Sequence, residues 1–357
     1  MPVSTPIDAP TLTYRELSAA FARAAEGAGG DLFESCYDFA GKPTRLRIVG
    51  GRLAGLIPRA LAHLRVPERP SAPGEFRIDL WDEAETGIGC PGCLPKDDPA
   101  APGMTEVSAN GVHVITTFAE IKSGLDRKSQ RIVGWVGNAD LLTQYDVGRP
   151  LHSQLLLWHR DRGLQALHAG LVGRGDDGIL LGGPGGSGKT TTALSCLQAG
   201  MAYLSDDYVV VDPNTGGAPL CHSVYCSAHV EPKHLERFPG LLPHAIPGRL
   251  AREDKSLLLL SDLPGAILRS SVRLRGIVFP QVVDAPVSSF RPASRAHALL
   301  RLAPSSLGLL PYPGALGDGF KALSALVDRV PVHWLDLGRD LEQIPRAVNA
   351  LFDEVSG

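Results

Sequence analysis

The sequence predicts an α/β protein with two domains, a smaller α/β domain in residues 1–150 and a larger domain with a mixed sheet in residues 151–357. Three observations lead to this prediction. The chain has 357 residues, which is more than one compact core usually holds. Short segments of alternating polarity, typical of strands, are interleaved with segments of helical periodicity. In the second half, an apolar strand leads directly into a glycine-rich loop and a helix.

Composition and charge exclude several classes of protein. Apolar residues make up 44% of the chain and charged residues 20%, as in proteins that fold. The net charge is −3 and there is no run of Lys and Arg, so we expect neither a nucleic-acid nor an anionic-membrane partner. No apolar window is long enough to span a membrane and the N-terminus has no cationic or apolar stretch, so we expect a cytoplasmic protein. Six cysteines are too few for a disulfide scaffold, and we expect reduced thiols.

The first domain shows packing patterns rather than a chemical motif. Its expected elements are a helix over 13–26, a strand over 44–49, a helix over 53–64, and strands over 75–81, 112–118 and 131–137; a helix over 152–160 follows the domain boundary near residue 150. Residues 86–105 are dense in Gly and Pro, so they are expected to form an exposed loop. Cys90 and Cys93 form a lone C-x-x-C within that loop. The spacing could be incidental, or the two cysteines could have a redox or metal-binding role.

The glycine-rich loop at residues 183–190 fits the pattern G-x-x-x-x-G-K-[ST]. Glycines allow backbone N–H groups to turn inward around phosphate oxygens, and the positive end of the following helix points at them. Lys189 would reach the terminal phosphates, and the Thr190 hydroxyl would bind Mg²⁺. The alternative is a glycine-rich turn that matches by chance. The candidate phosphate-binding residues are Gly183, Gly185, Gly186, Ser187, Gly188, Lys189, Thr190 and Thr191.

An acidic pair, Asp206 and Asp207, is expected to return to this loop. A helix over 188–199 advances about 18 Å at 1.5 Å per residue, and a strand over 202–206 comes back about 16 Å at 3.3 Å per residue. The two carboxylates therefore arrive beside Lys189 and Thr190. Because successive strand residues point to opposite sides, one carboxylate could hold a metal while the other faces an acceptor. The alternative is a solvated acidic turn.

His168 lies in a predicted strand over 167–172. An Asp-Gly turn joins this strand to the apolar strand over 178–182, so we expect two antiparallel neighbours. That arrangement would bring His168 to the phosphate end of the strands. A histidine in a strand can equally be a packing residue, and the spacing alone leaves both interpretations open.

Taken together, these motifs give the stretch 165–212 a resemblance to the catalytic domain of the HPr serine kinase/phosphorylase family, whose fold is similar to that of phosphoenolpyruvate carboxykinases. The resemblance rests on three elements in order: His168-Ala169-Gly170, the loop 183–190, and Ser205-Asp206-Asp207. A weaker likeness extends through the C-terminal half. The resemblance implies a phosphoenolpyruvate carboxykinase-like kinase domain that uses ATP and Mg²⁺.

The resemblance also implies roles for individual residues. Asp206, assisted by His168, would be the catalytic base that faces an acceptor hydroxyl, while Asp207 and Thr190 would bind Mg²⁺. A further signature of the family, which pairs a glutamate with an arginine before glycine, is replaced here by Arg273-Leu274-Arg275-Gly276. This departure argues against HPr as the substrate and against reverse phosphorolysis. The chain looks more like divergent relatives that tailor peptides, including kinases that phosphorylate a serine of a lasso-peptide precursor.

Two other groups of polar residues could have a chemical role. Arg249, Arg252 and Lys255 precede an apolar strand over 257–260, and a cationic loop there could clamp a transferring phosphoryl group or be merely solvated. We include Arg252 and Lys255 among the candidate cofactor-binding residues. Four histidines and two cysteines between residues 221 and 244 have none of the short paired spacings of a structural zinc site, so we do not expect zinc there.

The expected function is an ATP-dependent kinase that acts on a hydroxyl, with Asp206, His168 and Lys189 as its catalytic residues. Two alternatives stay open: a carboxykinase-like enzyme acting on a small oxyacid, and a nucleotide-gated binding module with slow hydrolysis. We expect residues 1–150 to recognise the acceptor. The identity of that acceptor, the choice among ATP, GTP and pyrophosphate, and whether the chain forms a homo-oligomer are left open by the spacing of the motifs.

Overall fold

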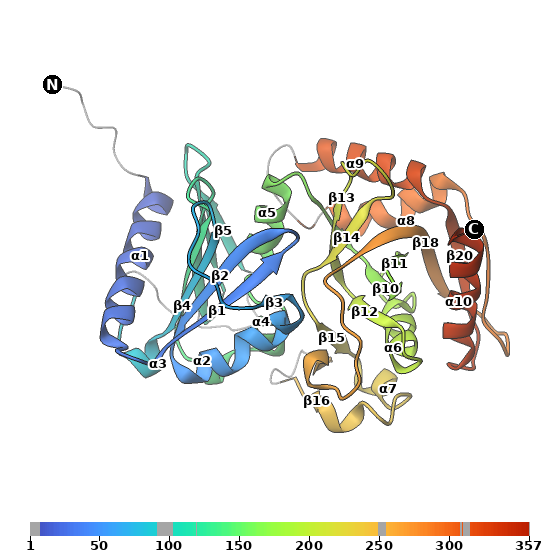
Figure 1. Ribbon diagram of the computed structural model, residues 1–357, viewed down its shortest axis with the longest axis horizontal. Helices are drawn as coiled ribbons and strands as arrows, with labels where there is room; N and C mark the ends of the chain where they lie inside the picture. Colours follow the sequence, from blue (N-terminus) through green and yellow to red (C-terminus); the bar gives the residue numbers. More distant parts are fainter. Residues whose placement is uncertain are drawn as a thin grey trace. The chain divides into compact units, whose positions relative to one another are not determined.

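The computed structural model describes residues 8–90, 103–118, 120–248, 255–307, 309 and 315–356 (Figure 1). The chain divides into two compact units, the first formed mainly by residues up to Trp158 and the second by residues from His159 onward. Residues Ala60–His63 belong to the second unit although they lie early in the sequence. In the described part of the chain, no helix is both long and apolar enough to cross a membrane.

The first unit is built on an eight-stranded mixed sheet in the order β3-β1-β2-β4-β8-β7-β6-β5. Strands β2, β4 and β8 are parallel, and the other neighbours are antiparallel. Its elements are α1 (Ala9–Gly27), β1 (Leu32–Phe39), β2 (Lys42–Val49), α2 (Gly51–Leu56), η1 (Ile57–Leu64), β3 (Arg65–Val66), β4 (Phe76–Asp82), α3 (Glu83–Thr86), β5 (Met104–Val107), β6 (His113–Thr117), β7 (Ile121–Asp126), β8 (Arg131–Val136), η2 (Ala139–Leu141), α4 (Gln144–Gly148) and α5 (His152–Asp161).

Helix α1 packs its apolar stripe against the sheet of this unit. Leu17 and Phe21 on α1 are buried with Trp81, Val133 and other residues of one sheet face. The segment expected to be one helix over 53–64 is instead α2 followed by the 3₁₀ helix η1. Pro58 at the second position of η1 has no backbone N–H and clashes with the preceding turn, so a continuous α-helix ends before it.

The second unit is built on a nine-stranded mixed sheet. Its main order is β12-β10-β11-β18-β14-β13-β9, with β20 beside the second half of β18 and β19 beside β20. Its elements are β9 (Gln165–His168), β10 (Gly170–Arg174), β11 (Asp177–Leu181), α6 (Lys189–Gln198), β12 (Ala202–Ser205), β13 (Tyr208–Asp212), β14 (Leu220–Ser223), β15 (Ser227–Val230), α7 (Pro232–Leu235), η3 (Leu242–His244), β16 (Ala245–Ile246), β17 (Ser256–Leu259), η4 (Leu260–Asp262), β18 (Ser271–Val282), β19 (Ser289–Pro292), α8 (Arg295–Leu307), α9 (Ala315–Arg329), β20 (Val332–Leu337) and α10 (Gln343–Ser356).

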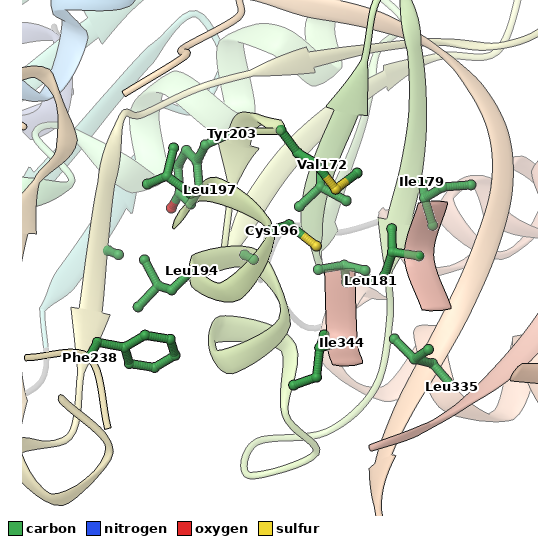
Figure 2. Packing of buried hydrophobic residues seen from close by; sticks show 14 of the residues in the cluster. Val172, Ile179, Leu181, Leu194, Cys196, Leu197, Tyr203, Phe238, Leu335 and Ile344 are labelled. Carbon is green, nitrogen blue, oxygen red and sulfur yellow. The ribbon is translucent and has the colours of Figure 1, made fainter. Parts of the chain in front are cut away.

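Both faces of this second sheet are buried. On one face, Ile179 and Leu181 of β11 pack in a cluster with residues of α6 and α10 (Figure 2). On the other face, Leu180 of the same strand packs with residues of α8 and α9. Because side chains alternate along a strand, this double burial explains why the strand that leads into the glycine-rich loop is a continuous apolar run. The α6 helix is thereby held rigidly at the end of β11.

Several expectations about the second half are confirmed by the sheet pairing. Strands β10 and β11 form the expected antiparallel hairpin, and α6 and β12 follow the glycine-rich loop as predicted. The expected single strand over 167–172 is wrong, however, because the chain is broken at Ala169 into β9 and β10. Strand β9 leaves the hairpin and pairs with β13.

The cysteines differ in one respect from the expectation of reduced thiols. Cys36, Cys196, Cys221 and Cys226 are buried and are not disulfide-bonded. Cys90 is disulfide-bonded. The greater part of the expected loop over 86–105, including Cys93, lies outside the described residues.

A buried histidine ties the short segment Ala60–His63 into the second unit. The Nε2 atom of His63 lies 2.7 Å from the Ser223 hydroxyl, and that hydroxyl donates a hydrogen bond to the carbonyl oxygen of Leu204. The hydroxyl proton is used on Leu204, so Nε2 of His63 must carry the donated hydrogen. Complete burial lowers the pKa of His63 to about 3.

This histidine makes the protein sensitive to acid. Its folded pKa lies below the unfolded value of 6.5, so the folded state binds fewer protons, and stability is full above pH 6.5 and is lost as the pH falls toward 3. From this group alone, we expect the free energy of unfolding to fall by about 2 kcal/mol between pH 7 and pH 5. His63→Gln should flatten that pH dependence in urea titrations. An unchanged slope in the variant would show that His63 is not the titrating group.

Candidate functional site

The candidate site lies where two neighbouring antiparallel segments of the chain, each made of two consecutive strands, are both interrupted. These two segments are called the ribbon below. Strands β9 and β10 run along β13 and β12, respectively, with His168 opposite Tyr208 and Leu171 opposite Ser205. Between these two registers, the pairing of the two segments skips two residues on each side, although Gly170 pairs with Leu181 of β11. Ala169 and Gly170 occupy one side of the gap, and the acidic pair 206–207 occupies the other. A break of this kind frees side chains that regular pairing would lock into alternation.

Ser205 shapes the turn that carries the acidic pair. Its Oγ atom accepts the backbone N–H groups of Asp207 at 3.0 Å and Tyr208 at 2.9 Å, which is a turn typical of serine. Gly170 allows the opposing chain to come close. A Cβ atom at this position would lie 3.2 Å from the Ser205 carbonyl oxygen and 3.2 Å from Leu181. A side chain at this position would therefore have to push its neighbours aside by a few tenths of an ångström.

The two carboxylates contact different partners. Asp206 is buried, and its Oδ2 atom accepts a hydrogen bond of 3.1 Å from the Thr190 hydroxyl at the start of α6. The Asp207 Oδ1 atom lies 2.5 Å from Nε2 of His168, and both of these side chains are one-quarter exposed. The ring of His168 is stacked on that of Tyr208, at 5.2 Å between centroids.

This division differs from the pairing that the resemblance implied. That pairing joined His168 to Asp206 and Thr190 to Asp207, whereas the structure joins His168 to Asp207 and Thr190 to Asp206. The reason lies in strand pairing. His168 is in register with Tyr208, so it reaches the residue next to Tyr208 rather than the one beyond it.

The glycine-rich loop has the backbone conformation that only glycine adopts readily. Gly183, Gly186 and Gly188 have φ angles of 126°, 76° and 107°. The first intrahelical bond of α6 that reaches back to the loop joins the Thr192 N–H to the Gly188 carbonyl. The N–H groups of residues 189–191 therefore lie in the first turn, where a helix binds anions.

Lys189 folds back over this loop. Its Nζ atom donates hydrogen bonds to the carbonyl oxygens of Gly183 at 2.8 Å and Pro184 at 3.1 Å. Burial lowers the pKa of Lys189, whereas the charges of Asp207 and Asp206 raise it. The ammonium group is thus held in a partly dehydrated position within electrostatic reach of both carboxylates.

Lys255 also lies near the loop. Its charge further lowers the pKa of Lys189, which places the two cations within electrostatic reach of each other. Arg249 and Arg252, the other members of the expected cationic segment, lie outside the described residues. Arg275 of the departed signature lies elsewhere: its Nε atom pairs with Asp177 at 2.7 Å, at the end of β11 opposite the glycine-rich loop.

The donor set beside α6 is compatible with Mg²⁺. Among the residues that the structure describes, no group of three or more His, Cys, Asp and Glu side chains is placed to hold a metal by itself. A magnesium ion bound with a nucleotide needs only one or two protein oxygens, because phosphates and water complete the octahedron. Thr190 and Asp206 offer such hard oxygens. The buried Oγ atom of Ser187, in the loop itself, lacks a hydrogen-bond partner in the described structure, as expected for a group that meets a ligand.

Sequence reasoning missed Tyr203, whose hydroxyl lies 3.1 Å from the Oδ1 atom of Asp206. No motif marks it, since an aromatic residue in a strand is most often only part of the core. Sequence reasoning quoted Ser205 within a motif but gave it no role. A serine directly before two acidic residues is a recognisable turn signal, and it could have revealed the shape of the bend.

The first unit, where acceptor recognition was expected, contains a cavity of about 680 Å³. It lies at the carboxyl ends of the parallel strands β2 and β4, the edge at which ligands bind in open α/β sheets. Its lining includes Arg23, Asp31, Gly50, Gly51 and Glu85. Acceptor binding by this unit stays a prediction.

Comparisons with known proteins do not assign a function, so any functional argument depends on the geometry of the site. No protein-family model matches the chain, and no curated protein matches it by sequence. A solved structure described as the Hpr(Ser) kinase/phosphatase from Coxiella burnetii matches with a TM-score of 0.29 and 11% identity, over 54% of this chain and 99% of that chain. This is a weak structural likeness over about half of the chain.

The loop geometry makes a testable distinction between two of its glycines. A Cβ atom at Gly188 would lie 2.3 Å from Cδ1 of the buried Leu337, and its φ is positive, whereas a Cβ at Gly185 would have open space. We expect Gly188→Ala to lower the free energy of unfolding by about 2–3 kcal/mol. Gly185→Ala should change it by less than about 1 kcal/mol. Urea unfolding followed by circular dichroism measures both, and equal losses would contradict the described loop.

Proposed function

We propose that the protein is an ATP-dependent kinase that transfers the γ-phosphoryl group to a hydroxyl, that of a serine in a peptide or protein. One observation supports this proposal above the others. Two adjacent carboxylates separate at the ribbon break, so that Asp206 meets the first turn of α6 while Asp207 meets His168. Phosphoryl transfer needs such a division, with one group at the nucleotide and another at the acceptor.

On the nucleotide side, the N–H groups of the glycine-rich loop and the first turn of α6 would hold the β- and γ-phosphates. Lys189 would exchange its two carbonyl partners for phosphate oxygens, which are stronger acceptors. Thr190 and Asp206 would hold Mg²⁺, which when bound neutralises charge on the phosphates. Lys255, whose charge acts on Lys189, would add positive charge at the same place.

On the acceptor side, Asp207 would take the proton of the attacking hydroxyl. The new bond forms between that oxygen and the γ-phosphorus, the bond to the bridging oxygen of ADP breaks, and the proton passes to Asp207. His168 would hold and orient the Asp207 carboxylate through its Oδ1 atom. A carboxylate is a weak base at pH 7, but the hydroxyl becomes acidic as the new bond forms, so late transfer is sufficient. The roles proposed here for Asp206 and Asp207 are thus the reverse of those that the resemblance implied.

The variants Asp207→Asn and Asp206→Asn should differ in nucleotide binding. We expect Asp207→Asn to lower kcat by about 10²–10⁴-fold while ATP affinity in Mg²⁺ stays within a few fold, because it removes only the base. Asp206→Asn should lower both kcat and the gain in ATP affinity that Mg²⁺ provides. Calorimetry with ATP, with and without Mg²⁺, measures the ATP affinities of the two variants, and a labelled-phosphate assay measures their kcat.

The acceptor assay uses the full chain with labelled ATP, Mg²⁺, hydroxyl-containing peptides encoded beside its gene, and small hydroxy acids, analysed by mass spectrometry. A phosphopeptide that disappears in Asp207→Asn supports the proposal. A phosphorylated small acid would instead indicate the carboxykinase-like alternative, and ADP alone would indicate a nucleotide-gated module. If Asp207→Asn retained most of the transfer rate, the assignment of the base would be overturned.

A further inference from the structure

Tyr203 is a core residue with one polar atom directed at the candidate site. It lies on β12, is fully buried, and its ring belongs to the apolar cluster beneath α6 (Figure 2). Its hydroxyl lies 3.1 Å from the Oδ1 atom of Asp206 and 2.8 Å from the carbonyl oxygen of Ser227. A buried tyrosine hydroxyl normally has a partner, but a carboxylate partner next to a nucleotide site has more than a packing consequence.

The contacts of Asp206 hold its carboxylate from two elements. Oδ2 receives the Thr190 hydroxyl from α6, and Oδ1 lies against the Tyr203 hydroxyl from β12. A single contact would leave the carboxylate free to turn about its terminal bond. With a hydroxyl at each oxygen, the plane of the carboxylate is fixed and Oδ2 stays directed to the first turn of α6.

The Tyr203 hydroxyl lies between two oxygen atoms. It has one hydrogen to donate, and its neighbours are Oδ1 of Asp206 and the carbonyl oxygen of Ser227, which can only accept. Because the ring is packed in the core, the place of the hydroxyl beside Oδ1 is set by the packing of the second unit.

From this arrangement, we propose that Tyr203 is a positioning residue for divalent-cation binding: its hydroxyl lies against Oδ1 and holds the Asp206 carboxylate with Oδ2 beside Thr190, and it thereby sets the affinity of the site for the metal that accompanies the nucleotide. The inference rests on the proposed function, because it concerns the same nucleotide site. It adds a residue that no motif of the sequence marks. Partners that orient a metal ligand in this way commonly change metal affinity by about 10–100-fold.

The test is Tyr203→Phe in the full chain, with Mn²⁺ as a spectroscopic probe of the metal. Phenylalanine keeps the ring in the core and removes only the hydroxyl. We expect the dissociation constant for Mn²⁺ in the presence of ATP, measured by electron paramagnetic resonance, to rise by about 10-fold or more. ATP affinity without a divalent cation should stay within about 2-fold, because the loop and Lys189 are unchanged. In activity assays the Mg²⁺ requirement should rise, while kcat at saturating Mg²⁺ recovers.

Tyr37→Phe is the matched control, because Tyr37 is equally buried but belongs to the first unit. It should leave Mn²⁺ affinity unchanged. A second variant, with 3-fluorotyrosine at position 203, keeps the shape and makes the hydroxyl a stronger donor, so its Mn²⁺ affinity should equal or exceed that of the natural protein. This second variant tests the inference even where the phenylalanine variant folds poorly.

The outcomes separate the inference from the proposed function. An unchanged Mn²⁺ affinity in Tyr203→Phe would overturn the positioning role while leaving the kinase proposal intact. Equal losses of ATP affinity with and without metal would also overturn it, because they would indicate a purely structural role. If the natural protein itself bound neither ATP nor Mn²⁺ with ATP, the proposed function would fail and the inference with it.

Discussion

The bend at residues 206–207 is the constraint on which the candidate site depends, because it lets two neighbouring carboxylates reach opposite partners. In a continuous strand, two successive side chains point to opposite faces of the sheet. The two carboxylates would then be directed into the two apolar clusters that cover those faces. The Ser205 hydroxyl holds the bend by taking two backbone N–H groups, and Gly170 lets the opposing chain approach the Ser205 carbonyl. The Ser205 side chain and the absence of a side chain at Gly170 thus decide where the two charges lie.

Electrostatic balance explains why so many charged groups can share this region. Removing Lys189 from water is costly, and the two carboxylates and two carbonyl oxygens offset that cost. Asp206 is buried as well, but two hydroxyl groups lie against its oxygens. Under the proposed function, a triphosphate entering the loop would add negative charge beside this carboxylate. A divalent cation bound with the nucleotide would offset that charge.

Local patterns predicted much of the fold and of the site. Three features were sufficient to predict β11, α6 and β12: the apolar run before the loop, the glycine spacing and the length of the following helix. They also predicted that the acidic pair returns to Thr190, which Asp206 contacts. These features depend on residues close in the sequence, so periodicity and chain reach describe them well. The same holds for α1, whose apolar stripe is evident from its spacing.

The partner of each carboxylate could not be predicted, because it depends on pairing between distant strands. The register of β9 with β13 sets His168 against Asp207, and no spacing within either strand specifies that register. The contact of Tyr203 with Asp206 could not be predicted for a related reason, because the partners of a buried hydroxyl depend on which groups the fold packs around it. In the first half, hydrophobic periodicity predicted one helix through residue 64. Pro58 ends the α-helix earlier, because the steric effect of proline outweighs the hydrophobic pattern.

The most direct test of this account is a crystal structure of the protein with Mg²⁺ and a non-hydrolysable ATP analogue. The account predicts that the metal lies beside Thr190 and Asp206, bound directly or through one water, while Asp207 stays on His168 and faces the γ-phosphate. A structure with Asp207 beside the metal and Asp206 on His168, or with both carboxylates remote from the phosphates, would contradict it.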